Sequence, residues 1–538
     1  MLKRIRETIK NAILNTYGDV ELPRLELDTA PEGMGDVATQ VAFRLAKTLR
    51  RSPFEIANRI TQSIKSPYIR DAVAVKPGYI NIFLDNLFFE EFIKKIEDEK
   101  LSYFQEPRKN IKIQVEFVSA NPTGPLHVGN GRGGIIGDVL SNLLKLEGYD
   151  ISKEYYVNDA GSKMDLFTDS IAYYYGKLCG IDSKFPEEGY KGDYIKNIAE
   201  DIYFKFKDRY AKNGKINKEA IRDLGKDFMI WQIQKSLARF GVFFDNWFYE
   251  STLYKNGDVE RTIETFKKSG YTYEKDGALW FRTTAFGDDK DRVLVRKTGE
   301  PTYTLVDAAY HKNKWERGFR KAIDIWGADH FGHIIPMKAL IQGLGIPEDF
   351  LDVIIYQIVH LYENGKEVMM SKHTGTFITL DELVSEVGKD AARFFFLLKS
   401  ADTHLNFDMT LAKKESVDNP VFYVQYTYAR LLNILKKSGV PVEDKSFNAN
   451  KLSEREERAL LNELIFIKEN LENISRTYSV NKLPFLAINL CKSANSFYQK
   501  HKVIGADNET ERLHLVNATI TALSMLMDLM GIEKKEKM

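Results

Sequence analysis

One segment constrains the fold of this chain more than any other: a strand-like run followed by a glycine-rich turn and an apolar helix. Residues 111–120, IKIQVEFVSA, are rich in β-branched and aromatic residues, and proline and glycine follow them. The next segment, GRGGIIGDVLSNLLKLEGY, has apolar residues at helical spacing. A doubly wound nucleotide-binding sheet begins in this way, with its ligand outside the carboxyl end of the first strand. The sequence therefore predicts a Rossmann sheet that starts near residue 111.

The rest of the chain predicts an α/β multidomain protein around this sheet. Its 538 residues exceed what one hydrophobic core usually holds. Residues 1–105 predict a small α/β domain, with helical spacing early and the strand-like run YINIFL near its end. We expect the sheet domain over 106–415, with a mostly helical insertion at about 165–270 and strand-like segments at ALWFRT, RVLVRK, AIDIWGAD and DVIIYQIVHL. Residues 416–538 predict an all-helical domain.

Composition excludes several kinds of site. The two cysteines, Cys179 and Cys491, are too far apart in sequence for a Cys-x-x-Cys zinc site or redox pair. A formal net charge of +1 gives no overall field for a polyanion, so any nucleic-acid contact must come from local patches. We expect a cytoplasmic protein with no membrane partner, because no run of roughly 18 to 20 apolar residues and no secretory signal is apparent.

The segment SANPTGPLHVGNGRGG, residues 119–134, lies between the predicted strand and helix. A helix N-terminus presents unpaired N–H groups, and glycines let a polyphosphate approach the backbone closely. His127 would lie at this phosphate site, where a cationic or hydrogen-bond-donating imidazole can stabilise charge on the α-phosphate as pyrophosphate leaves. On HVGN alone, a glycine-rich turn with a structural histidine is the alternative.

The whole string resembles the first signature of class I aminoacyl-tRNA synthetases, His-x-Gly-His, with the SANPTGP segment characteristic of arginyl-tRNA synthetases. The resemblance implies a catalytic His127 and ATP binding by His127, Gly129 and Asn130. The chain departs from the family at Asn130, where many members have histidine. A neutral amide can hydrogen-bond phosphate or ribose, but it cannot act as a cation.

A second signature lies in GKEVMMSKHTGTFITLDEL, where Met370, Ser371 and Lys372 resemble the Met-Ser-Lys core of the class I mobile loop. We expect this loop over about 364–380, with all three residues at ATP and Lys372 as the catalytic cation. A lysine on a flexible loop suits the transient neutralisation of pyrophosphate, because its contact must be strong only near the transition state. Taken alone, a loop lysine is more often a solvated charge.

The segment WGADHFGH follows the strand-like AIDI and implies ATP contacts by Gly327 and Asp329. A carboxylate at the end of a parallel strand is well placed to accept hydrogen bonds from ribose hydroxyls. His330 and His333 have i, i+3 spacing, so a metal site is an alternative, but no third ligand is evident nearby. The resemblance implies ATP with Mg²⁺, held mainly by the phosphates, and no structural metal.

Selection of arginine should require carboxylates, because a guanidinium is planar, always charged and best bound by bidentate acceptors. The resemblance implies that Glu116 and Asn121 bind the α-amino and carboxylate end of L-arginine. It also implies that the guanidinium is bound by Tyr303 and Asp307, which are one helical turn apart, and by a further acid, Glu250. Taken singly, each is more often a surface or capping group. The arginine that often precedes the family's aspartate is absent here, where the chain reads Leu-Val-Asp.

The segment DNPVFYVQYTYAR resembles the start of the family's helical anticodon-binding domain. Exposed Tyr423, Tyr426 or Tyr428 would stack on unpaired bases of tRNA(Arg). Alternatively, these rings pack the helices of their own domain. The resemblance as a whole implies an arginine–tRNA ligase, with a tRNA contact in the N-terminal domain, and we expect a monomer.

Two other functions remain open from the sequence. A small-molecule nucleotidylyltransferase would share the His-x-Gly-x site but would keep full turnover after truncation near residue 415. A non-catalytic tRNA-binding paralogue would keep the helical domain and lose the phosphate chemistry. His127 and Lys372 argue against the second alternative.

Overall fold

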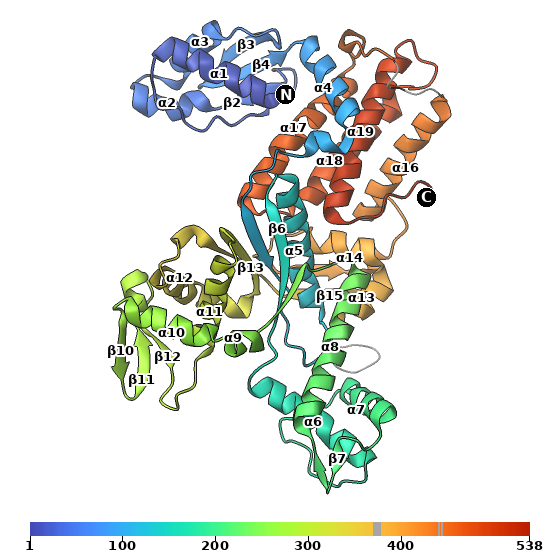
Figure 1. The fold of residues 1–538 in the computed structure, drawn as a ribbon. Helices are drawn as coiled ribbons and strands as arrows, with labels where there is room; N and C mark the ends of the chain where they lie inside the picture. Colours follow the sequence, from blue (N-terminus) through green and yellow to red (C-terminus); the bar gives the residue numbers. More distant parts are fainter. Residues whose placement is uncertain (369–377, 440–441, 443–444) are drawn as a thin grey trace. The chain divides into compact units, whose positions relative to one another are not determined.

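A computed structural model describes residues 1–368, 378–439, 442 and 445–538 (Figure 1). The chain divides into two compact units. One consists of Met1–Glu106 together with Glu415–Met538, and the other of Pro107–Lys414. The two ends of the chain, expected as separate domains, thus belong to one unit. The three-domain division with its boundaries stays a prediction.

Five parallel strands form the central sheet of the second unit, in the order β14-β13-β5-β6-β9. Figure 1 labels β6 and β13 of this sheet. The strand order reverses between β5 and β13, which makes this the switch point where ligands of doubly wound sheets bind, at the carboxyl ends of the strands. The predicted Rossmann sheet is confirmed. Its strands are β5 (Lys112–Glu116), β6 (Asp150–Val157), β9 (Asn246–Tyr249), β13 (Lys321–Gly327) and β14 (Leu351–Tyr356).

Helix α5 (Val128–Leu146) connects β5 to β6 and is buried over most of its length. Its small residues allow the helix to lie close to the chain that leaves β5. A Cβ atom at Gly137 would lie 2.2 Å from Cγ of Phe117, so only glycine fits there. On the other side of the switch point, α12 (Ile334–Gly343) connects β13 to β14.

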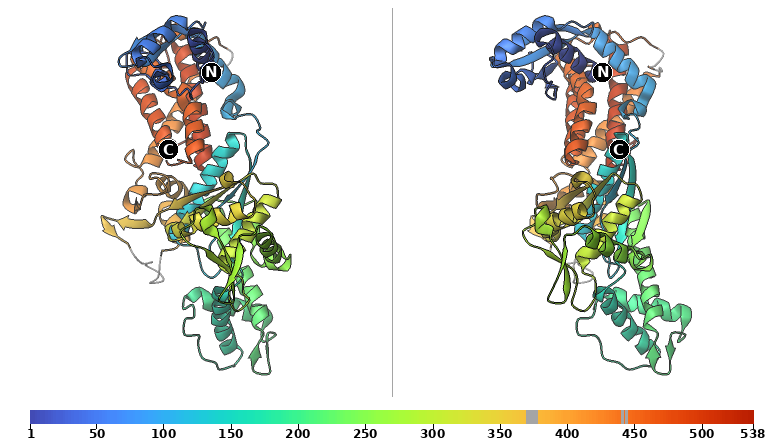
Figure 2. Two further views of the ribbon diagram at one scale, coloured as in Figure 1. Left: turned by 90° about the vertical axis from the view of Figure 1, so that its left-hand side faces the viewer. Right: turned by 60° about the vertical axis from the view of Figure 1, so that its left-hand side comes forward.

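The segment expected as a mostly helical insertion, about 165–270, consists mainly of helices. Helices α6 (Ser162–Leu178), α7 (Asp193–Phe206) and α8 (Lys218–Phe240) form a bundle with its own core, and β7 (Ala211–Lys212) and β8 (Lys215–Ile216) form a hairpin beside it (Figure 2). Strand β9 lies inside the 165–270 segment expected to be helical, yet it belongs to the parallel sheet. Four residues between two helices are too few to show strand periodicity in the sequence.

The strand-like segments ALWFRT and RVLVRK do not join the parallel sheet. They are β11 and β12 of an antiparallel sheet with the order β10-β11-β12. Helices α9, α10 and α11 contribute buried side chains to the apolar core that includes residues of β11 and β12. Periodicity locates a strand but does not identify its partner. These elements are β10 (Thr272–Lys275), β11 (Ala278–Phe281), β12 (Arg292–Val295), α9 (Ser251–Lys255), α10 (Asp258–Lys268) and α11 (Tyr303–Glu316).

The last part of this unit is a smaller sheet, in which β15 pairs in parallel with β17 and antiparallel with β16. Short helices follow the segment that carries the second signature. The elements are β15 (Val359–Glu363), β16 (Lys366–Glu367), α13 (Leu380–Val387), α14 (Lys389–Phe396), β17 (Leu405–Asp408) and α15 (Met409–Ala412).

In the first unit, an antiparallel sheet of order β1-β2-β4-β3 packs with three helices, and β4 coincides with the predicted strand YINIFL. The predicted all-helical C-terminal region is confirmed. The N-terminal elements are α1 (Leu2–Tyr17), β1 (Asp28–Thr29), β2 (Val37–Thr39), α2 (Val41–Leu49), α3 (Pro53–Ser63), β3 (Ile69–Val75), β4 (Tyr79–Leu84) and α4 (Asn86–Glu99), and the C-terminal helices are α16 (Pro420–Ser438), α17 (Arg455–Thr477), α18 (Lys482–Lys500) and α19 (Glu509–Met530).

Helix α19 corrects the expectation that no run of the chain is apolar enough to cross a membrane. By length and composition it meets that condition, but 83% of its most apolar window is buried inside the protein. It packs against α16, α17 and α18. Nearly every face of α19 is buried, as expected for a helix at the centre of a bundle.

Candidate active site

The first signature forms the turn between β5 and α5, and His127 is the N-cap of the helix. The backbone N–H of Asn130 donates to Nδ1 of His127 over 3.3 Å, and the backbone N–H of His127 donates to Oδ1 of Asn130 over 3.0 Å. This reciprocal capping gives the asparagine at the last signature position a structural role. Because Nδ1 accepts a hydrogen bond, the neutral ring carries its proton on Nε2.

The electrostatics of His127 favour a neutral donor over a cation. The side chain is solvent-accessible, but desolvation by the surrounding protein lowers the pKa of His127, and the Asp329 carboxylate opposes this shift. Asp329 belongs to the 3-10 turn Ala328–His333, directly after β13, and its side chain is 80% exposed. The fold thus brings the first signature and the WGADHFGH segment together at the switch point.

At two glycines of this site, a neighbouring side chain lies very close to the glycine backbone. A Cβ atom at Gly327 would lie 2.6 Å from Oδ1 of Asp329, and one at Gly129 would lie 3.0 Å from the ring of His127. Among the described residues, no group of three His, Cys, Asp or Glu side chains is arranged to hold a metal ion. The rings of His330 and His333 lie 5.8 Å apart, measured between their centres.

Met370, Ser371 and Lys372 lie outside the described residues. The chain that follows them is described, and Thr379 pairs with His127 in an isolated β-bridge. The backbone N–H of Leu380 donates to the carbonyl oxygen of Leu126 over 2.9 Å. Lys372 precedes Thr379 by seven residues, a length of chain that spans at most about 25 Å. The described chain after the second signature thus lies beside the first at Thr379 and Leu380.

Two acids expected at the guanidinium have raised pKa values. Glu250, which precedes α9, is 4% exposed and accepts a hydrogen bond from Oη of Tyr156 over 3.0 Å. Burial raises the pKa of Glu250 to about 7, and the charges of Asp307 and Asp159 add to the shift. Glu250 is the N-cap of α9, which packs against α11, the helix that carries Asp307. Such a group of carboxylates favours a cationic ligand.

Asp307 itself lies on α11 and its side chain is open to solvent. Even so, desolvation by the surrounding protein, with the carboxylates of Glu116 and Asp324, raises the pKa of Asp307 to about 6. Tyr303, one turn earlier on α11, is 57% exposed. Its Oη lies 3.5 Å from the position that a Cβ atom of Gly161 would take. The structure therefore groups Tyr303 and Asp307 on one side of α11.

Glu116 is the last residue of β5, and both of its carboxylate oxygens have partners. Oε1 accepts from Oγ of Ser119 over 2.9 Å, and Oε2 accepts from Nζ of Lys314 over 2.7 Å. Asn121 lies partly buried in the turn that follows. Lys314 was missed by sequence analysis, although it is on the same helix as Asp307, seven residues on, a spacing that returns to nearly the same face.

In the first unit, the three tyrosines of α16 differ in exposure. Tyr426 is 36% exposed, whereas Tyr428 is 9% exposed and packs inside the bundle, and Oη of Tyr423 accepts from Asn495 over 3.0 Å. Tyr426 lines a cavity of about 730 Å³ together with Arg430, Lys437, Tyr498 and Lys502. The Arg430 guanidinium lies 4.1 Å from the centre of the Tyr498 ring. Aromatic faces beside cations suit the bases and phosphates of single-stranded RNA.

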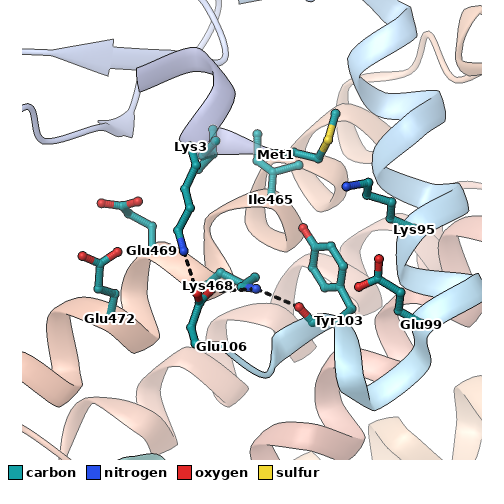
Figure 3. Close-up of a pocket in the computed structure, with 11 residues that line it drawn as sticks. Met1, Lys3, Lys95, Glu99, Tyr103, Glu106, Ile465, Lys468, Glu469 and Glu472 are labelled. Atoms are coloured by element: carbon teal, nitrogen blue, oxygen red, sulfur yellow. Dashed lines mark hydrogen bonds and ion pairs between the residues drawn. The ribbon is translucent and has the colours of Figure 1, made fainter. Parts of the chain in front are cut away.

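A smaller cavity in the same unit, of about 140 Å³, is lined largely by charged side chains (Figure 3). The carboxylate of Glu106 lies 2.6 Å from Nζ of Lys3 and 2.9 Å from Nζ of Lys468. Nζ of Lys468 also donates to the carbonyl oxygen of Tyr103 over 2.8 Å. These pairs join α1 to α17, so we interpret the cavity as part of the packing within this unit.

Three family models match the chain. They describe the N-terminal domain of arginyl tRNA synthetase at residues 3–84, the catalytic domain of class I (R) tRNA synthetases at 93–431 and the DALR anticodon binding domain at 424–538. An arginine–tRNA ligase of Caldanaerobacter subterraneus subsp. tengcongensis is 40% identical over all of this chain and 97% of its own length. One of Thermotoga maritima is 39% identical over the whole of both chains. The solved arginyl-tRNA synthetase of Thermus thermophilus has the same fold, with a TM-score of 0.80 over the whole of both chains at 20% identity.

Proposed function

This chain belongs to the class I arginyl-tRNA synthetases, and from that premise we propose how its residues carry out the arginine–tRNA ligase reaction. In this reaction arginine is activated with ATP to arginyl-adenylate and transferred to the terminal adenosine of tRNA(Arg), releasing AMP and pyrophosphate. Full-length similarity to ligases argues against both alternatives, the nucleotidylyltransferase and the non-catalytic paralogue.

We propose that ATP lies at the switch point between β5 and β13. Its phosphates face the N-terminus of α5 near Gly129, with Asn130 holding the turn, and its ribose hydroxyls donate to Asp329 beside Gly327. Nε2–H of His127 donates to the α-phosphate as the arginine carboxylate attacks it. Met370, Ser371 and Lys372 contact the pyrophosphate as it leaves, and Mg²⁺ accompanies ATP, held mainly by the phosphates.

The single observation that carries the assignment of arginine is the pair of neighbouring acids Glu250 and Asp307 with raised pKa values. The carboxylates of Glu250 and Asp307 each gain a cationic partner when the guanidinium of arginine binds. Tyr303 lies beside them in this proposal. An amino acid without a guanidinium would leave them unpaired, at a cost of about 1–3 kcal/mol for each. Glu116 and Asn121 hold the α-amino and carboxylate end.

Arginine binding is expected to weaken as pH falls, which tests this proposal. The pKa of Glu250 is raised to about 7 and that of Asp307 to about 6, so the free protein holds protons there that the guanidinium must displace. The Kd for arginine should therefore rise below about pH 7 and more steeply below about pH 6, by up to about tenfold per pH unit for each proton. Isothermal titration calorimetry in two buffers of different ionisation enthalpy measures both the Kd and the proton release. A Kd that stays constant from about pH 8 to about pH 5.5 would contradict the proposal.

We further propose that the cavity beside Tyr426 receives an unpaired base of the tRNA. Tyr426→Ala is expected to raise the KM for tRNA(Arg) about tenfold, because stacking of a base on an aromatic ring is worth about 1–3 kcal/mol. Aminoacylation kinetics measure this change, and the KM values for arginine and ATP should not move. Tyr426→Phe keeps the ring and serves as the control. Tyr423 and Tyr428 fit the packing alternative better than base stacking.

We also propose that the protein works in the cytoplasm as a monomer without a membrane partner, and that its N-terminal domain contacts the tRNA. The burial of α19 supports the absence of a membrane partner. Sedimentation velocity with and without tRNA(Arg) tests the oligomeric state.

A further inference from the structure

Helix α11 carries a buried charge cluster that the proposed substrate contacts do not include. The side chain of Lys314 is fully buried, with Nζ 2.7 Å from Oε2 of Glu116 and 2.8 Å from Oδ1 of Asp324. Asp324 lies directly opposite Glu116 in the register between β13 and β5. His311 completes the cluster, with Nε2 2.9 Å from Oδ2 of Asp324 and Nδ1 2.8 Å from the carbonyl oxygen of Asp307. The cluster thus links the two ends of the expected arginine site.

Two buried carboxylates on neighbouring strands repel each other, and the weaker acid tends to take up a proton. Burial raises the pKa of Glu116, and Lys314 opposes that rise. Burial acts on Asp324 in the same direction, but Lys314 and His311 hold the pKa of Asp324 below its usual range. Glu116 is therefore the carboxylate that would be protonated first if the ammonium group of Lys314 were removed.

Other groups around Glu116 do not replace that ammonium. From α11, Asp307 adds negative charge, and the Tyr310 ring lies 4.4 Å from Nζ of Lys314, measured to its centre. From β6, Tyr156 lies near Glu116 and donates to Glu250. Also from α11, His311 lowers the pKa of Glu116 to a lesser extent than Lys314, but its ring contacts Asp324. Arg317 is held by both oxygens of Glu154, at 2.6 and 2.8 Å.

We propose that Lys314 is a positioning residue for arginine, which fixes the Glu116 carboxylate at the end of β5 in its ionised form for the α-ammonium group of the substrate. Ser119 holds the other carboxylate oxygen, so the direction of the group is fixed from two sides. With Glu116 and Asp324 ionised and Lys314 protonated, these three groups carry one net negative charge. The α-ammonium group of arginine matches that charge. The inference rests on the proposed role of Glu116.

Lys314→Met is expected to raise the KM for arginine about tenfold or more at about pH 7.5, with the KM for ATP within about twofold of wild type. The ratio of variant to wild-type KM should fall toward one by about pH 9.5, because hydroxide then removes the proton that Lys314 otherwise keeps off Glu116. Steady-state aminoacylation across this range measures the ratio. A ratio that is independent of pH, or an equal rise in the KM for ATP, would overturn the proposal.

Arg317→Met is the matched control, because Arg317 caps the same helix and its removal breaks a different buried ion pair. It should lower the melting temperature without a pH-dependent change in the arginine KM. If Lys314→Met does not fold, Lys314→Met/Asp324→Asn keeps the net charge of the three groups unchanged. Because this variant also removes the carboxylate that repels Glu116, its arginine KM should rise through the lost positioning of Glu116 but depend less on pH, and an arginine KM equal to that of wild type would overturn the proposal. Glu116→Gln separates the two hypotheses: an unchanged arginine KM in that variant removes the proposed role of Glu116 itself.

Discussion

Replacing Asp307 by alanine is expected to raise the KM for arginine about a hundredfold or more, with the KM for ATP changed by less than about threefold. A guanidinium loses a charge-assisted contact in this variant, and Glu250 alone faces the whole cation. The loss is specific because Asp307 is on α11, whereas the proposed ATP contacts lie near the carboxyl ends of β5 and β13. Aminoacylation kinetics with each substrate varied in turn measure the effect.

Two variants make this test specific to the proposed contact. Asp307→Asn keeps the size of the side chain but removes the charge, and it should resemble the alanine variant. Glu316→Ala removes an exposed acid near the C-terminus of the same helix, where it pairs with Lys312, and it should behave as wild type. An arginine KM within about threefold of wild type for Asp307→Ala would remove Asp307 from the binding site.

Lys372→Ala is expected to slow formation of arginyl-adenylate by two or more orders of magnitude, that is by about 3 kcal/mol or more in the barrier, with little change in the Kd for arginine. The lysine neutralises charge that develops only as pyrophosphate leaves, so ground-state binding should not need it. Seven residues after this lysine, Thr379 pairs with His127 of the first signature. Single-turnover quench-flow with saturating tRNA(Arg) measures the rate.

Lys366→Ala is the control for this variant, because Lys366 is an exposed lysine of the neighbouring strand β16. It should leave the rate of adenylate formation unchanged. If Lys372→Ala retained a near-wild-type rate, the second signature would have no catalytic role in this chain.

The sequence predicted those strands and helices whose hydrophobic period is visible within a single segment. The run IKIQVEFVSA and the glycines after it predicted β5 and α5, since one strand and one amphipathic helix each show their own period. Strand β9 was missed because it has only four residues. Strands β11 and β12 were predicted, but the antiparallel sheet that they form was not. Pairing of strands depends on distant segments, which a local pattern does not contain.

The same limit applies to the site. Resemblance named Glu116 and Asp307, but it did not show that Lys314 holds Glu116, because these residues are 198 positions apart in the sequence. Nor did the sequence show that Asn130, which stands where many family members have histidine, completes the capping of α5 with His127. Both facts depend on how a side chain is oriented in the folded protein, and motif spacing alone does not determine that orientation.

The pairing of Lys3 and Lys468 with Glu106 has a consequence for how the protein is made. Helix α1 precedes α17 by more than three hundred residues, so the contacts that complete the first unit must wait until residues 107–414 have been synthesised. Residues 107–414 emerge as one uninterrupted stretch and can fold during synthesis. During that interval, residues 1–106 lack the C-terminal helices that belong to the same unit.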